Sequence, residues 1–410
     1  MKKSLFRVIL ILNILFSIEG FIAQDTLKVT YYNLLNFPSQ QQDRVDTLKK
    51  ILDFIKPDIF LVNELTSFNG AMLIKNNALN FNGFNTYQSA LFYDGPDTDN
   101  LLYYNDSKFG LYSQNQINTT LRDISEYILY YKDPNLGTSN DTTFINFYSL
   151  HLKAGNSSTS EERRNQDAVI FKQYLIENGI TKNLFVGGDF NFYNSTELGC
   201  QEILYGQDLE LLDPLDKIGN WHTNSNYMDC HTQSTRLNTG GYAGGANGGM
   251  DDRFDFIFVS EDIMNGSGGV KYVDNSYVAD GQDGSYFNQE INFSSNSVVP
   301  NNIARALFYM SDHLPVSLQF FVDQTLDNFE TKDDKNEIIF NSSSNSLLVK
   351  DIKNIENLKI HDINGRCVWE KQIYNGNYIS ADLSMLKIGF YVLNCRTKNK
   401  FLIKKFIINN

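Results

Sequence analysis

The sequence has few cysteines and no internal repeats. Its four cysteines include no CxxC pair, so the spacing typical of a cysteine-bound zinc ion is absent. So few cysteines also exclude a disulfide-rich scaffold, and the lack of repeats excludes a solenoid. Two alternatives remain for the thiols. Either they are free, or Cys200 pairs with Cys230 and Cys367 with Cys395.

Long apolar runs are also scarce, and the only marked one lies at the N-terminus. Met1–Lys3 is basic, Val8–Phe16 is apolar, and Ala23 provides a small residue for cleavage. This pattern predicts a secretory signal peptide over residues 1–24. The run is too short to span a bilayer, and no other stretch approaches spanning length. We therefore expect an exported protein that is not integral to a membrane.

Basic side chains are in deficit over most of the chain. The protein has 35 Lys and Arg against 48 Asp and Glu, a formal net charge of −13. Residues 1–24 carry +2 and residues 331–410 carry +5, which leaves −20 for residues 25–330. A region this acidic repels polyanions unless bound cations intervene. The charge therefore disfavours nonspecific binding of nucleic acid through a basic stripe.

Residues 25–322 alternate between apolar strands and amphipathic helices. The apolar periodicity predicts helices over 42–55 and 160–178. Strands are predicted at 26–35, 58–65, 100–104, 109–112, 127–131, 143–152, 183–189, 253–260 and 314–322. A glycine-rich loop is predicted over 237–252. An aperiodic polar segment over 323–337 predicts a linker, and the short β-runs of 338–410 predict a small all-β sandwich.

Polar side chains lie at the ends of several apolar strands. They are Asn33, Glu64, His151, Asp189, Asn191, Asp255, Asp312 and His313. One such residue alone usually forms a turn or a cap. Together they offer what phosphoester hydrolysis needs: oxygen ligands for a hard cation, imidazoles that titrate near neutral pH, and a carboxylate to orient an imidazole. His222, His231 and His361 have no supporting motif and are interpreted as surface or packing residues.

The order of these motifs resembles the endonuclease/exonuclease/phosphatase superfamily. The segments are YNLLNF, VNEL, LHL, GGDFNF, RFDFIFVS and SDHLPV, and they cover nearly all of residues 25–322. The resemblance implies an α/β fold, a four-layered α/β/β/α sandwich of two mixed sheets with the site at one end. It also implies Mg²⁺, with Mn²⁺ or Ca²⁺ as alternatives.

The resemblance further implies roles for individual residues. Asn33 and Glu64 would hold the cation, with Asp312 beside it. Asp189 and Asn191 would position water and phosphate, and Asp255 would pair with His313, the general base. His151 matches a second histidine that contacts phosphate or protonates the leaving oxygen. Arg122 stands where deoxyribonuclease-like members bind phosphate, although a plain surface arginine is an equal alternative.

Two sequence features bear on the substrate. Deoxyribonuclease-like members support their second histidine with a glutamate, where this sequence has Asp97-Thr98-Asp99. An aspartate is therefore expected to substitute for that glutamate. Abasic-site endonucleases have a tyrosine where His151 stands, which disfavours that substrate.

The tail resembles the type A sorting domain of the type IX secretion system. The markers are INGR at 363–366, DLS-x-L-x-x-G-x-Y at 382–391 and the basic, apolar end at Lys404-Lys405-Phe406. They imply export through the periplasm and outer membrane, removal of the tail, and release or attachment at the cell surface. The partner would be the type IX machinery, and no stable protein partner is expected otherwise. A carbohydrate-binding β-sandwich is the alternative.

Three functions follow from these features. The first is a secreted nuclease that cuts DNA or RNA. The second is a phospholipase C of the sphingomyelinase type or another phosphatase. For the phospholipase, 285–287 or 87–93 would provide an exposed aromatic hairpin. The third is an inactive surface-binding protein, which the intact set of polar residues argues against.

Overall fold

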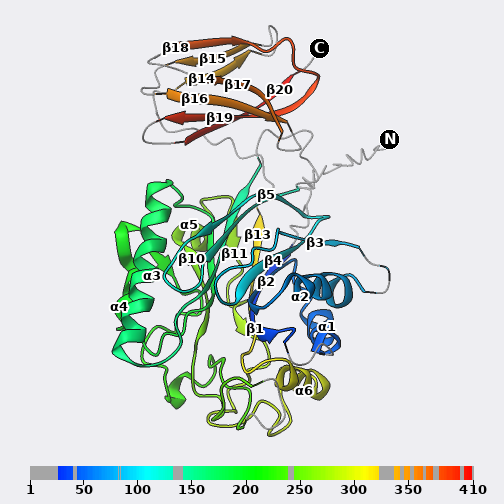
Figure 1. The fold of residues 1–410 in the computed structure, drawn as a ribbon, viewed down its shortest axis with the longest axis vertical. Helices are drawn as coiled ribbons and strands as arrows, with labels where there is room; N and C mark the ends of the chain where they lie inside the picture. Colours follow the sequence, from blue (N-terminus) through cyan, green and yellow to red (C-terminus); the bar gives the residue numbers. More distant parts are fainter. Residues whose placement is uncertain are drawn as a thin grey trace, which may run out of the picture.

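The computed structural model describes residues 26–39, 44–81, 83, 85–132, 142–238, 244–322, 337–341, 346–350, 355–362, 366–372, 378–397 and 401–408. Two mixed sheets stack face to face, with helices on both outer faces (Figure 1). This four-layered α/β/β/α arrangement confirms the predicted fold class. The predicted signal peptide, most of the predicted linker and part of the INGR motif lie outside the described residues.

The first sheet has the strand order β11-β13-β1-β2-β4-β3, and β12 also pairs with β13. Its strands are β1 (Thr26–Phe37), β2 (Ile59–Leu65), β3 (Tyr87–Ser89), β4 (Asp99–Asn105), β11 (Val270–Tyr272), β12 (Val278–Ala279) and β13 (Val316–Val322). Its helices are α1 (Arg44–Ile55), α2 (Phe68–Leu73) and α6 (Asn301–Met310), with a π-helical turn at Ile74–Leu79. Apolar side chains of α1 and α6 pack into the same core as β1 and β2.

The second sheet has the order β5-β6-β7-β8-β10-β9. Its strands are β5 (Phe109–Ile117), β6 (Ile124–Tyr131), β7 (Phe144–His151), β8 (Leu184–Asp189), β9 (Leu211–Leu212) and β10 (Asp255–Ser260). Its helices are α3 (Ser158–Glu177) and α4 (Leu198–Tyr205), which pack against it through a second core, and a short helix, α5 (Glu261–Asn265), follows β10. No helix among the described residues is long and apolar enough to cross a membrane.

The C-terminal residues form two small antiparallel sheets. One contains β14 (Glu337–Asn341), β15 (Ser346–Lys350) and β18 (Tyr378–Asp382). The other contains β16 (Ile355–Asp362), β17 (Cys367–Gln372), β19 (Gly389–Thr397) and β20 (Phe401–Ile408). A separate apolar core lies among them. All four cysteines of the chain are free thiols.

Strand direction brings the polar strand ends to one edge of the sandwich. β1 and β2 are parallel, and so are β7 and β8, so the carboxyl ends of each pair lie side by side. β10 runs antiparallel to β8 and places Asp255 opposite Asp189. β13 runs antiparallel to β1, so the segment that precedes it arrives at the same edge.

The two glycines before Asp189 allow the sheets to approach closely. A Cβ atom on Gly187 would lie 2.7 Å from the ring of Tyr31 on the facing sheet. Gly188 has φ +128°, and a Cβ atom there would lie 2.1 Å from the carbonyl oxygen of Leu150. Glycine at 188 is therefore required both by the backbone conformation and by the neighbouring strand.

A buried amide network joins the sheets next to these glycines. Asn63 of β2 donates to Asn100 Oδ1 of β4 at 2.6 Å and to Ser149 Oγ of β7 at 3.1 Å. Its own Oδ1 accepts from the backbone N of Asp189 at 3.2 Å. Because buried amides are costly unless paired, this network fixes the register in which the two sheets meet.

One buried ion pair supports the loop before β10. The guanidinium of Arg253 binds both carboxylate oxygens of Asp213 at 2.8 Å and lies 4.3 Å from the ring centroid of Phe256. Burial alone would raise the pKa of Asp213, but Arg253 outweighs it and lowers that pKa. The pair therefore holds the 213–217 turn against the strand that carries Asp255.

Removing one member of this pair tests its contribution to stability. Asp213→Ala leaves a buried guanidinium unpaired and should lower the free energy of unfolding by ~3–5 kcal/mol. Urea unfolding followed by the fluorescence of buried Trp221 measures the loss. Asp229→Ala removes the exposed partner of Lys217, and we expect a change within about 0.5 kcal/mol. Equal effects of the two variants would contradict a supporting role for the buried pair.

Candidate active site

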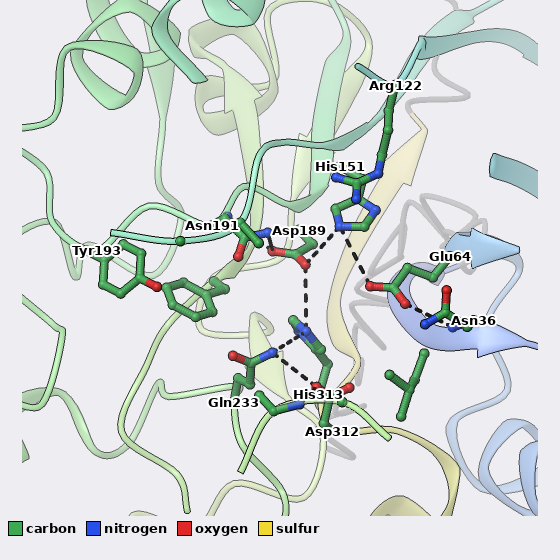
Figure 2. Close-up of a pocket in the computed structure, with 16 residues that line it drawn as sticks. Asn36, Glu64, Arg122, His151, Asp189, Asn191, Tyr193, Gln233, Asp312 and His313 are labelled. Carbon is green, nitrogen blue, oxygen red and sulfur yellow. Dashed lines mark hydrogen bonds and ion pairs between the residues drawn. The ribbon is translucent and has the colours of Figure 1, made fainter. Parts of the chain in front are cut away.

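The polar strand ends surround a cavity of about 370 Å³ (Figure 2). Of the residues named from the sequence, Glu64, Arg122, His151, Asp189, Asn191, Asp312 and His313 line it. Asn33 and Asp255 lie behind this lining and contact it through hydrogen bonds. The structure thus brings all nine candidate residues to one place.

Asn33 connects two carboxylates at the centre of the site. Its Nδ2 donates to Glu64 Oε1 at 2.9 Å and to Asp189 Oδ2 at 3.0 Å. Its Oδ1 accepts from the backbone N of Leu35 at 2.9 Å. In this orientation Asn33 holds the two carboxylates, and ligation of a cation through its oxygen would require the amide to rotate.

Glu64, which is half-buried, and Asp189, which is buried, both have raised pKa values. Burial raises the pKa of Glu64, and the charge of Asp312 raises it further. Burial raises the pKa of Asp189 to about 7, where Asp255 and Glu64 add to the rise and His313 opposes it. Glu64 has φ +58° at a bulge in β2, an unusual conformation for a non-glycine residue. The bulge turns its carboxylate toward Asp189.

His313 and Asp255 form a hydrogen-bonded pair. His313 Nδ1 lies 2.7 Å from Asp255 Oδ2, and its Nε2 lies 3.6 Å from Asp189 Oδ2. Burial alone would lower the pKa of His313, but Asp255, Asp189 and Asp312 together raise it well above its usual value. The sequence did not single out Gln233, whose Nε2 lies 2.6 Å from His313 Nε2 and 3.4 Å from Asp312 Oδ2.

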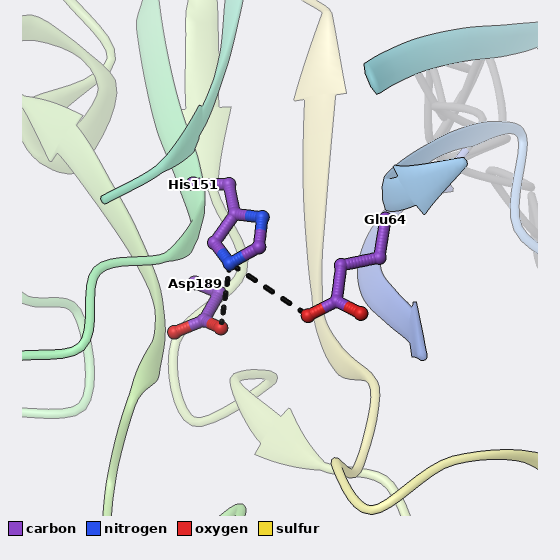
Figure 3. A group of neighbouring side chains, drawn as sticks. All are labelled: Glu64, His151 and Asp189. Carbon is purple, nitrogen blue, oxygen red and sulfur yellow. Dashed lines mark ion pairs between the residues drawn. The ribbon is translucent and has the colours of Figure 1, made fainter. Parts of the chain in front are cut away.

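His151 lies between both central carboxylates. Its Nε2 is 3.7 Å from Glu64 Oε1 and 3.6 Å from Asp189 Oδ2 (Figure 3). Burial lowers its pKa well below the usual value, and Arg122 and His313 act in the same direction. Its Nδ1 is buried and has no hydrogen-bond partner among the described residues.

The predicted aspartate support for His151 is not formed. Asp97 Oδ2 instead pairs with Arg122 Nε at 2.8 Å, and Asp99 Oδ1 accepts from the backbone N of Gly95 at 2.7 Å. The Asp97 pair and a 3.3 Å hydrogen bond to the carbonyl of Leu152 hold Arg122 at the cavity wall. The loop of 94–99 folds back on its own backbone, which turns both aspartates away from the imidazole.

Two buried arginines fix the segment that carries Asp312 and His313. Arg44 donates to the carbonyls of Leu34, Leu35 and Met310 at 2.8–2.9 Å. Arg236 donates to Phe308 and Tyr309 at 2.8 and 3.2 Å and to Gly244 at 3.1 Å. They satisfy the free carbonyls at the end of α6. The glycine-rich loop then places the backbone N of Ala246 2.6 Å from Asp312 Oδ2.

The residues present fit a divalent cation. Ligand atoms of Glu64, His151 and Asp189 all lie within 4.8 Å of one another. The cluster is rich in carboxylate oxygen, which suits Mg²⁺, Mn²⁺ or Ca²⁺. Buried carboxylates that raise each other's pKa gain stability from a nearby positive charge. The geometry therefore makes Asp189 a candidate ligand besides those expected from the sequence, and His151 lies next to it.

Comparison with known proteins agrees with the motif order. The model of the endonuclease/exonuclease/phosphatase family matches residues 30–313. The secretion system C-terminal sorting domain matches residues 336–409, which confirms the predicted type IX sorting domain and indicates a secreted or cell-surface location. No curated protein matches the chain.

Several solved structures are similar to the larger part of this chain. D. rerio TDP2 complexed with single strand DNA product is 15% identical, with 72% of this chain and 99% of that chain covered and a TM-score of 0.48. An endonuclease/exonuclease/phosphatase family protein from Bacteroides thetaiotaomicron is 15% identical, with 73% and 99% covered and a TM-score of 0.47. A mannosyl-6-phosphatase from the same species is 16% identical, with 72% and 99% covered and a TM-score of 0.44.

If Asp189 holds a divalent cation, its raised pKa predicts that binding of the cation is coupled to loss of a proton. Below about pH 7 a proton on this carboxyl competes with the cation, so affinity should fall about tenfold per pH unit there and level off above. Calorimetric titration of the protein with Mg²⁺ between pH 5 and 9 measures this slope. Asp189→Asn should flatten the slope, whereas Asp229→Asn, which changes an exposed acid, should keep it. An unchanged slope in Asp189→Asn would contradict the assignment.

Proposed function

Because the chain belongs to the endonuclease/exonuclease/phosphatase family, we propose that it is an exported, metal-dependent phosphodiesterase that cuts extracellular nucleic acid. The observation that carries this proposal is the pair of imidazoles on one carboxylate: Nε2 of His151 and Nε2 of His313 each lie 3.6 Å from Asp189 Oδ2. Two imidazoles at one carboxylate can provide the proton acceptor and the proton donor that cleavage of a phosphodiester requires. We assign residues 25–322 to the catalytic domain, 323–337 to a linker and 338–410 to the sorting domain.

The proposed mechanism uses a divalent cation near Glu64, Asp189 and Asp312. When bound, the cation neutralises charge that develops on the phosphoryl oxygens. Asp255 orients His313, which takes the proton of the attacking water at Nε2. The neighbouring carboxylates raise the pKa of His313 and so favour its imidazolium. A bound cation would neutralise part of their charge and lower that pKa, so that Nε2 could accept this proton. Asp189 and Asn191 orient the water and the phosphate.

Arg122 and His151 act on the side of the cavity away from His313. Arg122 lines the cavity, and its guanidinium is already oriented by Asp97, so it can bind a non-bridging phosphate oxygen with little loss of side-chain entropy. We assign His151 to contact with the phosphate, because its lowered pKa favours the neutral imidazole. Delivery of a proton to the leaving oxygen would require the charge of the bound phosphate to raise that pKa. The His151 side chain is almost fully buried, although it lines the cavity.

The acidic character of residues 25–330 shapes the proposed activity. With no basic stripe to hold a polyanion, binding should be weak and should depend strongly on divalent ions. This suits an exported enzyme that degrades nucleic acid outside the cell, where processive binding to long duplexes is not required.

One surface feature favours a phospholipid as the second candidate. Phe68, Leu91 and Tyr93 are 63%, 70% and 48% exposed, and the ring centroids of Phe68 and Phe92 lie 6.4 Å apart. This cluster begins three residues after β2, close to Glu64. An exposed apolar cluster of this kind can enter a membrane interface. The other expected hairpin, 285–287, cannot do so through Tyr286, because that ring is fully buried.

Substrate assays test the proposal directly. We expect the purified protein to cut supercoiled plasmid or RNA in Mg²⁺ or Mn²⁺, and chelator to abolish cleavage. His313→Ala and Glu64→Gln should each lower kcat by roughly 10²–10⁴-fold, because they remove the base and a cation ligand. His361→Ala, in the tail, should leave cleavage unchanged.

The same assays separate the alternatives. Turnover of sphingomyelin vesicles with no cleavage of polynucleotide would replace the nuclease proposal by the phospholipase. Lack of turnover of every phosphoester, by a protein that is folded and binds the cation, would favour a surface-binding protein. Full activity of Glu64→Gln would contradict the proposed cation site.

A further inference from the structure

One wall of the cavity consists of rings that the proposed mechanism does not use. Tyr193 and Phe254 line the cavity, and in Figure 2 Tyr193 lies across it from Glu64. Tyr193 stands only two residues after Asn191, so it is carried by the same turn that positions the phosphate-side amide. The ring is partly exposed, whereas Phe254 behind it is buried.

Tyr193 is rigidly supported. Its backbone N donates to Glu197 Oε1 at 2.7 Å, and Glu197 is held by buried Arg164 at 2.7–2.8 Å. The Arg164 guanidinium lies 5.7 Å from the Tyr193 ring centroid, and the Phe254 ring meets it edge-on at 5.0 Å. A ring fixed in this way loses little entropy when a ligand stacks on it.

His222 extends this wall to the surface. Its ring centroid lies 4.9 Å from that of Tyr193 at an interplanar angle of 75°. Its Nδ1 lies 2.6 Å from Asp252 Oδ1, and the Asp252 carbonyl accepts from the backbone N of Gln233 at 3.0 Å. The His222 side chain is 41% exposed, and its Nε2 has only a 3.4 Å contact with Thr223 Oγ1. The imidazole is therefore oriented by Asp252, and Nε2 remains accessible.

We propose that Tyr193 and His222 form a subsite for the base of the nucleotide that carries the scissile phosphate. This inference rests on the proposed nuclease function and specifies what lies next to the phosphate. A base has a flat face that stacks on Tyr193 and a polar edge that hydrogen-bonds to Nε2 of His222. Tyr193 follows Asn191 by two residues and lines the same cavity, and His222 contacts the Tyr193 ring. A group attached to a phosphate held at Asn191 would therefore lie beside these rings.

The charges around Tyr193 distinguish a base from a choline headgroup. A quaternary ammonium is bound by open aromatic faces, with a free carboxylate to balance its charge. Here the Arg164 cation already faces Tyr193, and the Asp252 carboxylate is engaged by His222. Asp251 is also engaged, by Thr223 Oγ1 at 3.2 Å. The wall therefore suits a neutral aromatic ring better than an organic cation.

Two esters with the same scissile bond test the subsite. They are thymidine 5′-(p-nitrophenyl phosphate), which carries a base, and methyl p-nitrophenyl phosphate, which does not. For the wild-type protein in Mg²⁺ we expect kcat/KM to favour the thymidine ester by roughly 10- to 100-fold, the range of base stacking on an aromatic side chain. Tyr193→Leu and His222→Leu should each reduce this ratio several-fold, mainly through KM. Tyr205→Leu, an exposed tyrosine on α4, should leave the ratio unchanged.

The outcomes separate this inference from the proposed function. Equal hydrolysis of both esters by the wild-type protein, or a preference that both variants retain, would overturn the subsite and leave the phosphodiesterase intact. If neither ester is hydrolysed, both the subsite and the proposed phosphodiesterase function are overturned. If Tyr193→Leu does not fold, as judged by its thermal transition, the surface variant His222→Leu decides the question alone.

Discussion

Mutual repulsion among buried carboxylates is the constraint on which the site depends. Glu64, Asp189, Asp255 and Asp312 meet at one edge of the sandwich, all but the first almost fully buried. Each has a specific compensation. Asp255 has the imidazole of His313, Asp312 has the backbone N of Ala246, and Asn33 donates to the remaining two. What these contacts leave uncompensated is a negative charge beside Glu64 and Asp189, and we propose that a divalent cation balances it.

The surrounding fold is arranged to keep these groups in place. The parallel pairs β1–β2 and β7–β8 bring the strand ends together, and the amide network around Asn63 sets their register. Arg44 and Arg236 bind the carbonyls at the end of α6, so the segment before β13 cannot shift without leaving buried guanidinium groups unpaired. The positions of Asp312 and His313 are thus determined by contacts far from the reaction itself.

Much of the catalytic fold could be predicted because its central strands are continuous apolar runs. The strands predicted at 58–65, 183–189 and 253–260 differ from β2, β8 and β10 by at most two residues at either end. Helix α6 was missed, since it follows a segment rich in Asn and Ser without a clear start. The acidic and imidazole candidates were recognisable from motif order, and their roles remain predictions. Gln233 and His222 have no local signal, because isolated bridges and a ring contact across the fold bring them to the site. Tyr193 follows Asn191 by two residues, but the sequence does not show that its ring lines the cavity.

The left-handed backbone conformations at Glu64 and Asn191 limit the transfer of this site to another protein scaffold. Both residues have φ above +50° without being glycine, so their side chains leave the backbone in directions that a regular strand does not offer. Copying the polar residues onto an ideal sheet would reproduce their order in the sequence but not the directions of their side chains. A designed catalyst of this type has to import the bulge in β2 and the turn after Asp189 together with the residues they carry.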